Sequence, residues 1–372
     1  MYTLFALLAL RCAIRVYRLE SVPRKLCFAA AMLGLVMLAS ISKPVGVFFA
    51  VALPSLYCLT FVLPRSPHKR RLVLWGCGIA VGLMFAAKVW LLKTDAWVAI
   101  CERFGGNLQC YFCEQMIVFW RYIGLTVWPS PANLNVDHAV AHCRYSLADD
   151  DVLLSAAALF LLVLAPAIYL VRKKPAVSFL LLTIPLGVLP YFVLISAEAM
   201  VEYRFYLPLA AFCGLVGMAA AFFLDRDKAI GRILIATVVI FSVAGTVVRN
   251  EVWRSDVSLW SDAAQKSPRK ARTINGLAWA LLSDNVPEDA RRGLELAKRS
   301  FDPRYVDLPP AFNPYMVDTL AEAYFRNGDV ERAIRIEQAL LKQGIGDTYY
   351  FGQQLHRYTA AKRKMQAGRP SR

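Results

Sequence analysis

Charged side chains at the ends of apolar stretches are the first candidates for chemistry in this chain. Lys43, within Ser42-Lys43-Pro44, separates two apolar runs, and Glu202 and Arg204 stand at the start of another. Ionisable groups at the edge of a bilayer are costly and are often functional. Two interpretations are open. In the first, the Lys43 ammonium extends to water and the charges near residue 202 pair with one another. In the second, Lys43 and Arg204 bind the phosphate of a lipid headgroup and Glu202 orients it.

A turn rich in proline and asparagine is the next candidate. It reads Trp128-Pro129-Ser130-Pro131-Ala132-Asn133-Leu134-Asn135-Val136-Asp137. Asparagine and aspartate side chains stabilise such a turn by bonding to the backbone two residues further on. Asn135 and Asp137 could equally bind the hydroxyl groups of a sugar, and the sequence leaves both interpretations open.

Four of the nine cysteines fall in one predicted outer loop, over about residues 93–151: Cys101, Cys110, Cys113 and Cys143. Outside the cytoplasm, one or two disulfides among them are expected, in any of three pairings. Cys110, Cys113, His138 and His142 have the ligand types of a zinc site but not the spacing of a zinc finger. No thioredoxin-like pattern surrounds Cys110-x-x-Cys113, so a redox role is not favoured. The sequence contains no P-loop, dinucleotide fingerprint, Gly-x-Ser-x-Gly or His-Glu-x-x-His motif.

The elements that must position these residues are membrane-spanning helices. The chain is 58% hydrophobic, and its apolar runs are separated by clusters of lysine and arginine. Eight spans keep every basic cluster on the cytoplasmic side, with both chain ends outside. They are predicted at about 2–19, 26–42, 45–63, 72–92, 152–171, 177–195, 205–224 and 233–249. This positive-inside pattern accounts for the net charge of +16, so we expect no nucleic-acid partner.

One apolar stretch, Gln115–Trp128, is short and carries Arg121 in its middle. If it crossed the membrane, the basic cluster that follows would move outside. We therefore expect an amphipathic helix in the outer interface, with Trp120, Tyr122 and Trp128 as interfacial aromatic residues.

The sequence predicts an all-α chain in which residues 1–250 form the membrane bundle and a small soluble helical domain follows. Residues 251–346 contain two helix pairs with the spacing of tetratricopeptide (TPR) repeats. The first pair has six matching positions: Leu277, Ala278, Leu281, Ala290, Leu294 and Ala297. The second repeats half of that pattern 43 residues further on, and residues 347–372 form a capping helix and a basic tail.

These motifs, in this order, resemble those of membrane glycosyltransferases of the GT-C superfamily that carry TPR repeats, such as the transmembrane-and-TPR O-mannosyltransferases. Four stretches of the chain carry the resemblance: Ser42-Lys43-Pro44, Arg121-Tyr122 with Trp128-Pro129 through Asp137, Glu202-Tyr203-Arg204-Phe205-Tyr206-Leu207-Pro208, and Arg249-Asn250-Glu251-Val252-Trp253 with Leu259-Trp260. They span about residues 26–345. Tyr203 departs from the pattern, because the family usually has histidine there.

The resemblance implies transfer of a sugar from a polyprenyl-phosphate donor to a protein or glycan acceptor at the outer face of a membrane. Lys43, Arg121 and Arg204 would then lie near the donor phosphate, and Glu202, Asn135 and Asp137 near the sugar or acceptor. Cations, or a divalent metal, would stabilise the leaving phosphate. We expect a bacterial inner-membrane protein whose C-terminal domain lies in the periplasm and contacts the acceptor.

The family's catalytic acidic pair follows its first span, and no counterpart is present here, since the first acidic residue is Glu20. The chain therefore resembles the C-terminal half to two-thirds of such an enzyme. Two alternatives remain open. One is a non-catalytic TPR scaffold in the membrane that recruits periplasmic partners. The other is an enzyme like the O-antigen polymerases and ligases, for which the large outer loop offers Arg103, Arg121, Arg144, His138 and His142.

Overall fold

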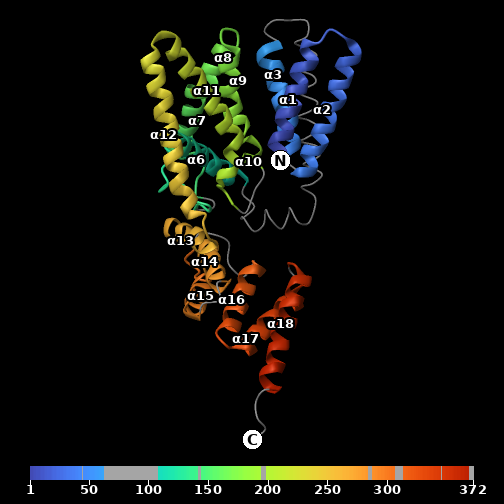
Figure 1. Ribbon diagram of the computed structural model, residues 1–372, viewed down its shortest axis with the longest axis vertical. Helices are drawn as coiled ribbons and strands as arrows, with labels where there is room; N and C mark the ends of the chain where they lie inside the picture. The colour runs from blue at the N-terminus through green and yellow to red at the C-terminus, as the bar shows by residue number, and fades with distance from the viewer. Residues whose placement is uncertain are drawn as a thin grey trace. The chain divides into compact units, whose positions relative to one another are not determined.

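In the part of the chain that it describes, the computed structural model contains helices joined by turns and irregular segments, and no strand occurs there (Figure 1). The described residues are 1–43, 45–62, 108–140, 144–193, 198–283, 287–305, 313–344 and 346–367. The chain forms two compact units. Unit 1 consists of Met1–Trp128 and Cys143–Ile240, and unit 2 of Pro129–His142 and Phe241–Arg372.

Unit 1 is built from apolar helices. They are α1 (Tyr2–Arg18), α2 (Val22–Ser42), α3 (Gly46–Tyr57) with η1 (Cys58–Val62), α6 (Leu108–Val127), α7 (Asp150–Leu159) with η3 (Phe160–Leu164) and α8 (Ala165–Leu170), α9 (Pro175–Leu186), α10 (Leu189–Val193), η4 (Glu202–Phe205) and α11 (Tyr206–Arg226). The next helix, α12 (Lys228–Val252), begins in unit 1 and ends in unit 2.

Five of the described helical stretches are long and apolar enough to cross a membrane: Val22–Ser42, Asp150–Leu170, Pro175–Phe192, Glu202–Arg226 and Lys228–Val252. The chain thus fits a multi-pass membrane protein. The predicted span at 45–63 is the shorter apolar helix Gly46–Val62. The predicted span at 2–19 is α1, which has 17 residues with three arginines and is not among the helices long and apolar enough to cross. The predicted span at 72–92 lies outside the described residues.

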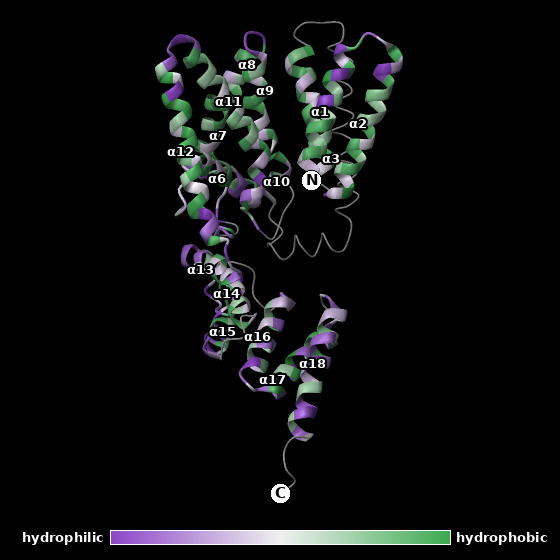
Figure 2. Ribbon diagram, in the orientation of Figure 1, coloured by the Kyte–Doolittle hydropathy of each residue, from purple (hydrophilic) through white to green (hydrophobic). Residues whose placement is uncertain are grey.

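The described basic turns of unit 1 gather at one end of its helices. Figure 2 shows hydrophilic residues where α1 meets α2, where α8 meets α9 and where α11 meets α12, with hydrophobic residues along the helices between. A shared side for lysine and arginine is the arrangement expected of cytoplasmic loops. Lys43, at the end of α2, and Glu202, before α11, lie at the opposite end, which we call the Lys43 end.

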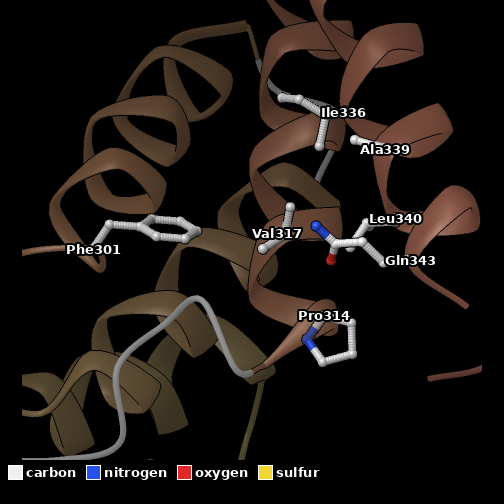
Figure 3. Close-up of a pocket in the computed structure, with 7 residues that line it drawn as sticks. All are labelled: Phe301, Pro314, Val317, Ile336, Ala339, Leu340 and Gln343. Atoms are coloured by element: carbon white, nitrogen blue, oxygen red, sulfur yellow. The ribbon is translucent and has the colours of Figure 1, made fainter. Parts of the chain in front are cut away.

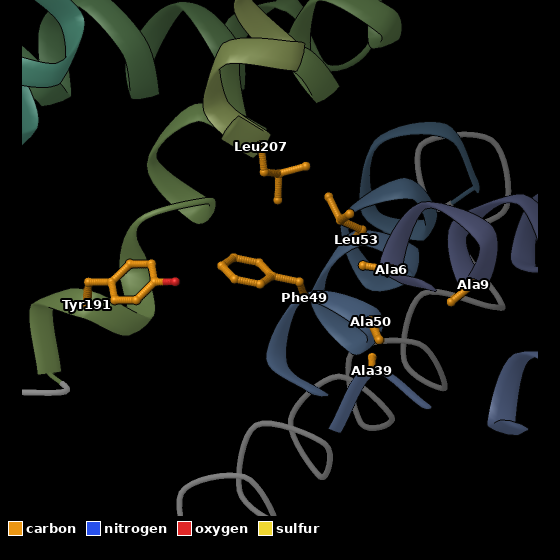
Figure 4. Close-up of a cluster of buried hydrophobic side chains, with 8 residues drawn as sticks. All are labelled: Ala6, Ala9, Ala39, Phe49, Ala50, Leu53, Tyr191 and Leu207. Atoms are coloured by element: carbon orange, nitrogen blue, oxygen red, sulfur yellow. The ribbon is translucent and has the colours of Figure 1, made fainter. Parts of the chain in front are cut away.

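Small residues bring the helices of unit 1 together. Its core contains Ala6, Ala9, Ala39, Phe49, Ala50, Leu53, Tyr191 and Leu207 (Figure 4). Gly46 shows how close the approach is, because a Cβ atom there would lie 2.2 Å from the carbonyl oxygen of Ala39. Alanine and glycine allow such backbone contact between helices in an apolar solvent, where close packing replaces the hydrophobic effect. In Figure 4 the ring of Phe49 points from α3 toward Tyr191 and Leu207, which joins α1–α3 to the later helices of this unit.

Unit 2 is a stack of helix pairs. Its helices are α13 (Asp256–Lys266), α14 (Ala271–Ser283), α15 (Pro287–Arg299), α16 (Pro314–Arg326), α17 (Val330–Gln343) and α18 (Thr348–Ala367). α14 packs on α15, α16 on α17, and α18 on α17. Alanines line the crossings, among them Ala278 and Ala297 in the first pair and Ala321 and Ala333 in the second. These four residues are fully buried, so their small size sets the distance between helices.

Three carboxyl groups are buried where α16, α17 and α18 meet. Glu337 is fully buried beside Asp318, and burial raises the pKa of both carboxyls, that of Glu337 to about 9. At neutral pH Glu337 is therefore protonated, while the Tyr350 hydroxyl donates to Asp318 at 3.2 Å. Glu322 differs, because it accepts from Tyr358 at 2.8 Å and pairs with arginines of α16 and α18.

Candidate functional site: two cations among tyrosines

Lys43 lies against aromatic rings at the Lys43 end of unit 1. It ends α2 in an extended conformation. Its Nζ is 4.6 Å from the centre of the Tyr203 ring and 5.8 Å from the centre of the Tyr2 ring. Both distances are within the range in which an ammonium is attracted to the face of a ring. The side chain of Lys43 is partly exposed, so the ammonium is held and remains accessible.

Arg204 lies in the same region and is only 5% exposed. It belongs to the 3₁₀ turn η4, whose backbone places its guanidinium 4.8 Å from the centre of the Tyr191 ring. Its Nη1 donates to the carbonyl oxygen of Glu198 at 2.7 Å, and its Nη2 is 3.9 Å from the Glu198 carboxylate. Arg204 therefore pairs with Glu198 within this loop. Pairing of this kind is one of the two interpretations that the sequence leaves open.

The two cations share one group of tyrosines. Tyr2 packs against the core cluster that contains Tyr191. The Tyr191 ring lies against the Arg204 guanidinium, and the Tyr2 ring lies under the Lys43 ammonium. Lys43 and Arg204 are 161 positions apart in the sequence and are brought together by packing of α1–α3 against α9–α11. The sequence predicts that both cations bind one ligand, but it does not single out Tyr2 or Tyr191. Tyrosines are common at the ends of membrane spans, so their positions alone do not indicate a binding site.

Helix α6 fixes the loop that carries Arg204. The Tyr122 hydroxyl donates to the carbonyl oxygen of Val201 and accepts from its N–H, both at 2.8 Å, and the Tyr122 ring stacks on Phe205. Gln115 Nε2 donates to the carbonyl oxygen of Ala199 at 3.0 Å. Burial raises the pKa of Tyr122, which keeps its hydroxyl neutral.

The contacts of α6 lie at one end of the other helices. Trp120 Nε1 donates to the carbonyl oxygen of Ser155 near the start of α7, and Phe112 packs on Phe192 in α10. Because Tyr122 meets the start of α11, α6 lies across the Lys43 end and does not run beside the spans. Arg121, the third predicted cation, is exposed on α6, whereas Tyr122, expected at the membrane surface, is buried.

Asn135 and Asp137 belong to unit 2 and are both 2% exposed. Asn135 Nδ2 donates to Ser267 Oγ at 2.9 Å, and its Oδ1 accepts from the N–H of Asp137 at 3.3 Å, as in an Asx turn. The Asp137 carboxylate is 2.5 Å from Lys270 Nζ and 3.7 Å from Arg272. Both side chains therefore tie the segment 129–140 to the start of α14.

Two of the predicted disulfide cysteines, Cys110 and Cys113, are buried on α6, and Cys113 is a free thiol. Burial raises the pKa of Cys113, so its thiol is protonated. Cys101, Cys143 and His142 lie outside the described residues. Within the described part of the chain, no group of three or more His, Cys, Asp or Glu residues could hold a metal ion.

The arrangement at the Lys43 end suits an anion. A lysine supplies a point charge, an arginine supplies directed donors, and tyrosine hydroxyls add neutral donors beside them. Comparisons with known protein families, with curated proteins and with solved structures each gave no match for this chain.

Proposed function

We propose that the Lys43 end binds the phosphate of a polyprenyl-phosphate sugar, and that the chain is a GT-C-like membrane glycosyltransferase. The observation that carries the proposal is the convergence of Lys43 and Arg204 on one group of tyrosines. A phosphate attached to a lipid reaches this site from the membrane, because the site lies at the end of apolar helices.

In such a reaction the chain's own residues act on the leaving group. The Lys43 ammonium and the Arg204 guanidinium stabilise the negative charge that develops on the phosphate as its bond to the sugar breaks. Glu198 holds Arg204 in orientation. Deprotonation of the acceptor requires a general base, which the resemblance assigns to an acidic pair absent from this sequence. Phosphate binding is thus the part of the reaction that these residues support.

The test is a binding measurement on the full chain in nanodiscs of zwitterionic lipid. The Kd of the chain for a fluorescent polyprenyl phosphate is compared with its Kd for the matching fluorescent polyprenol, which lacks the charge. Lys43→Ala is expected to weaken phosphate binding at least about tenfold, the usual size of one charge-assisted contact, and to leave polyprenol binding unchanged.

Lys173→Ala is the matched control, because Lys173 lies in a basic turn at the opposite end of unit 1. Arg204→Lys tests the second cation while retaining its charge, and a loss there shows that the directed donors of arginine matter. Equal binding of the phosphate and the alcohol by the unsubstituted chain would contradict the proposal.

A scaffold role for unit 2 is favoured by one separate observation. A cavity of about 310 Å³ lies between α16, α17 and the turn after α15. Figure 3 shows its lining, which is Phe301, Pro314, Val317, Ile336, Ala339, Leu340 and Gln343. An apolar side chain of a partner protein would fit there, with the Gln343 amide as its polar contact. Under this alternative, Ala339→Phe abolishes partner binding in a pull-down while phosphate binding persists.

A further inference from the structure

We infer that Tyr203 is a positioning residue that holds the Lys43 ammonium for the anion, an inference that rests on the phosphate site proposed above. The Tyr203 ring lies nearer to Lys43 Nζ than the Tyr2 ring does, at 4.6 Å against 5.8 Å. Tyr203 contacts no ligand in this role and acts through Lys43.

The physical reason is the freedom of a lysine side chain. A four-carbon stem lets an exposed ammonium occupy many positions, and ordering it on a ligand costs conformational entropy. A ring face attracts the cation by its quadrupole and fixes it before the ligand arrives. Because Lys43 is partly exposed, the nearer of its two ring contacts, that with Tyr203, favours positions in which its charge lies next to the Arg204 turn.

The local backbone makes this contact a consequence of the Arg204 turn. Tyr203 and Arg204 are neighbours in η4, and the buried Arg204 is anchored on Glu198. Tyr203 is 40% exposed, so its ring stands outward while Arg204 points inward. One turn of four residues thus positions both cations, Arg204 directly and Lys43 through the ring.

The experiment measures phosphate binding by the full chain in nanodiscs, with the same fluorescent polyprenyl phosphate. Tyr203→Leu is expected to raise the Kd about 2- to 10-fold, the range for one cation–ring contact. Tyr203→Phe keeps the ring, so it is expected to bind the phosphate as the unsubstituted chain does. Phenylalanines with one, two and three fluorines at position 203 are expected to raise the Kd stepwise, since each fluorine weakens the quadrupole and barely changes the shape. Tyr206→Leu is the control, because Tyr206 is exposed at the same end and begins α11.

A second readout needs no ligand. The rate at which an amine-reactive reagent labels Lys43, followed by mass spectrometry, is expected to rise in Tyr203→Leu and to stay unchanged in Tyr206→Leu. An unchanged labelling rate, or equal binding across the fluorinated series, would overturn the role of Tyr203. If labelling changes and the unsubstituted chain binds phosphate and alcohol equally, the phosphate site itself is wrong, and the role of Tyr203 in binding falls with it.

Discussion

Two buried carboxyl groups of unit 2 have opposite surroundings. Asp137 is buried, is paired with Lys270 and lies near Arg272, so two cations surround it. Glu337 lies against another acid, Asp318, and holds its proton at neutral pH. The sequence shows Asp137, Asp318 and Glu337 only as acidic residues in a polar domain. Whether each carboxyl is buried, and which residue it contacts, depends on packing between segments that are distant in the chain.

Removing Lys270 tests whether Asp137 is structural. Lys270→Met is expected to lower the free energy of unfolding of unit 2 by about 3–5 kcal/mol, because it leaves a buried carboxylate without its main partner. The double variant Asp137→Asn with Lys270→Met is expected to recover most of the loss. Chemical denaturation of the full chain in nanodiscs measures both. Additive effects of the two changes would show that the pair is not coupled.

The pH dependence of unit 2 follows from Glu337. Its pKa is about 9 in the folded chain and near the ordinary value of 4.5 when unfolded, so its contribution to stability is complete below about pH 4.5. The contribution of Glu337 to the free energy of unfolding then falls by up to about 1.4 kcal/mol per pH unit as the pH rises from 4.5 toward 9.

Glu337→Gln is expected to flatten this dependence, because an amide cannot ionise and can still donate to Asp318. Calorimetry of the full chain at pH 5 and pH 8 gives the slope. A slope that is the same in Glu337→Gln and in the unsubstituted chain would assign the dependence to other groups.

At the level of elements, α6 shows how far the sequence could predict the site. Its short apolar pattern with Arg121 predicts an interfacial helix, and α6 is not among the described helices that are long and apolar enough to cross a membrane. The pattern could not show that Tyr122 meets Val201, 79 residues away, because that contact depends on tertiary packing. For the same reason, Lys43 and Arg204 were identified from their position at span ends, whereas Tyr2 and Tyr191 were not.

Tyr122→Phe is expected to loosen the Arg204 turn. It keeps the stack on Phe205 and leaves the N–H of Val201 unpaired, at a cost of about 1–3 kcal/mol, while the Val201 carbonyl still accepts from the N–H of Arg204 at 3.1 Å. We expect weaker polyprenyl-phosphate binding, measured as above, and no change for Tyr206→Phe at the same end. Full binding by Tyr122→Phe would mean that the turn keeps its geometry without α6.

For the whole molecule, the helices after Lys174 determine on which side unit 2 lies. Three candidate spans, Pro175–Phe192, Glu202–Arg226 and Lys228–Val252, follow Lys174. We expect all three to cross, which would put the chain after Val252 on the side of the membrane opposite to Lys174. The basic turn at Lys174 is expected in the cytoplasm.

A reporter active only in the periplasm is therefore expected to be off when fused after Lys174 and on when fused after Arg372. Both fusions retain the chain up to the junction, and protein levels are compared by immunoblot. The same reporter state at the two positions would mean that one of the three helices does not cross.

Unit 2 is assembled from two stretches of chain separated by about a hundred residues, Pro129–His142 and the part after Ile240. During synthesis the first stretch emerges well before Ser267, Lys270 and the rest of α14 exist. Asn135 and Asp137 must then remain hydrated until the later helices are inserted and the C-terminal region is delivered to the same side. A chain released before α13 is made would therefore leave this stretch without the Ser267 and Lys270 contacts that hold it in the finished unit.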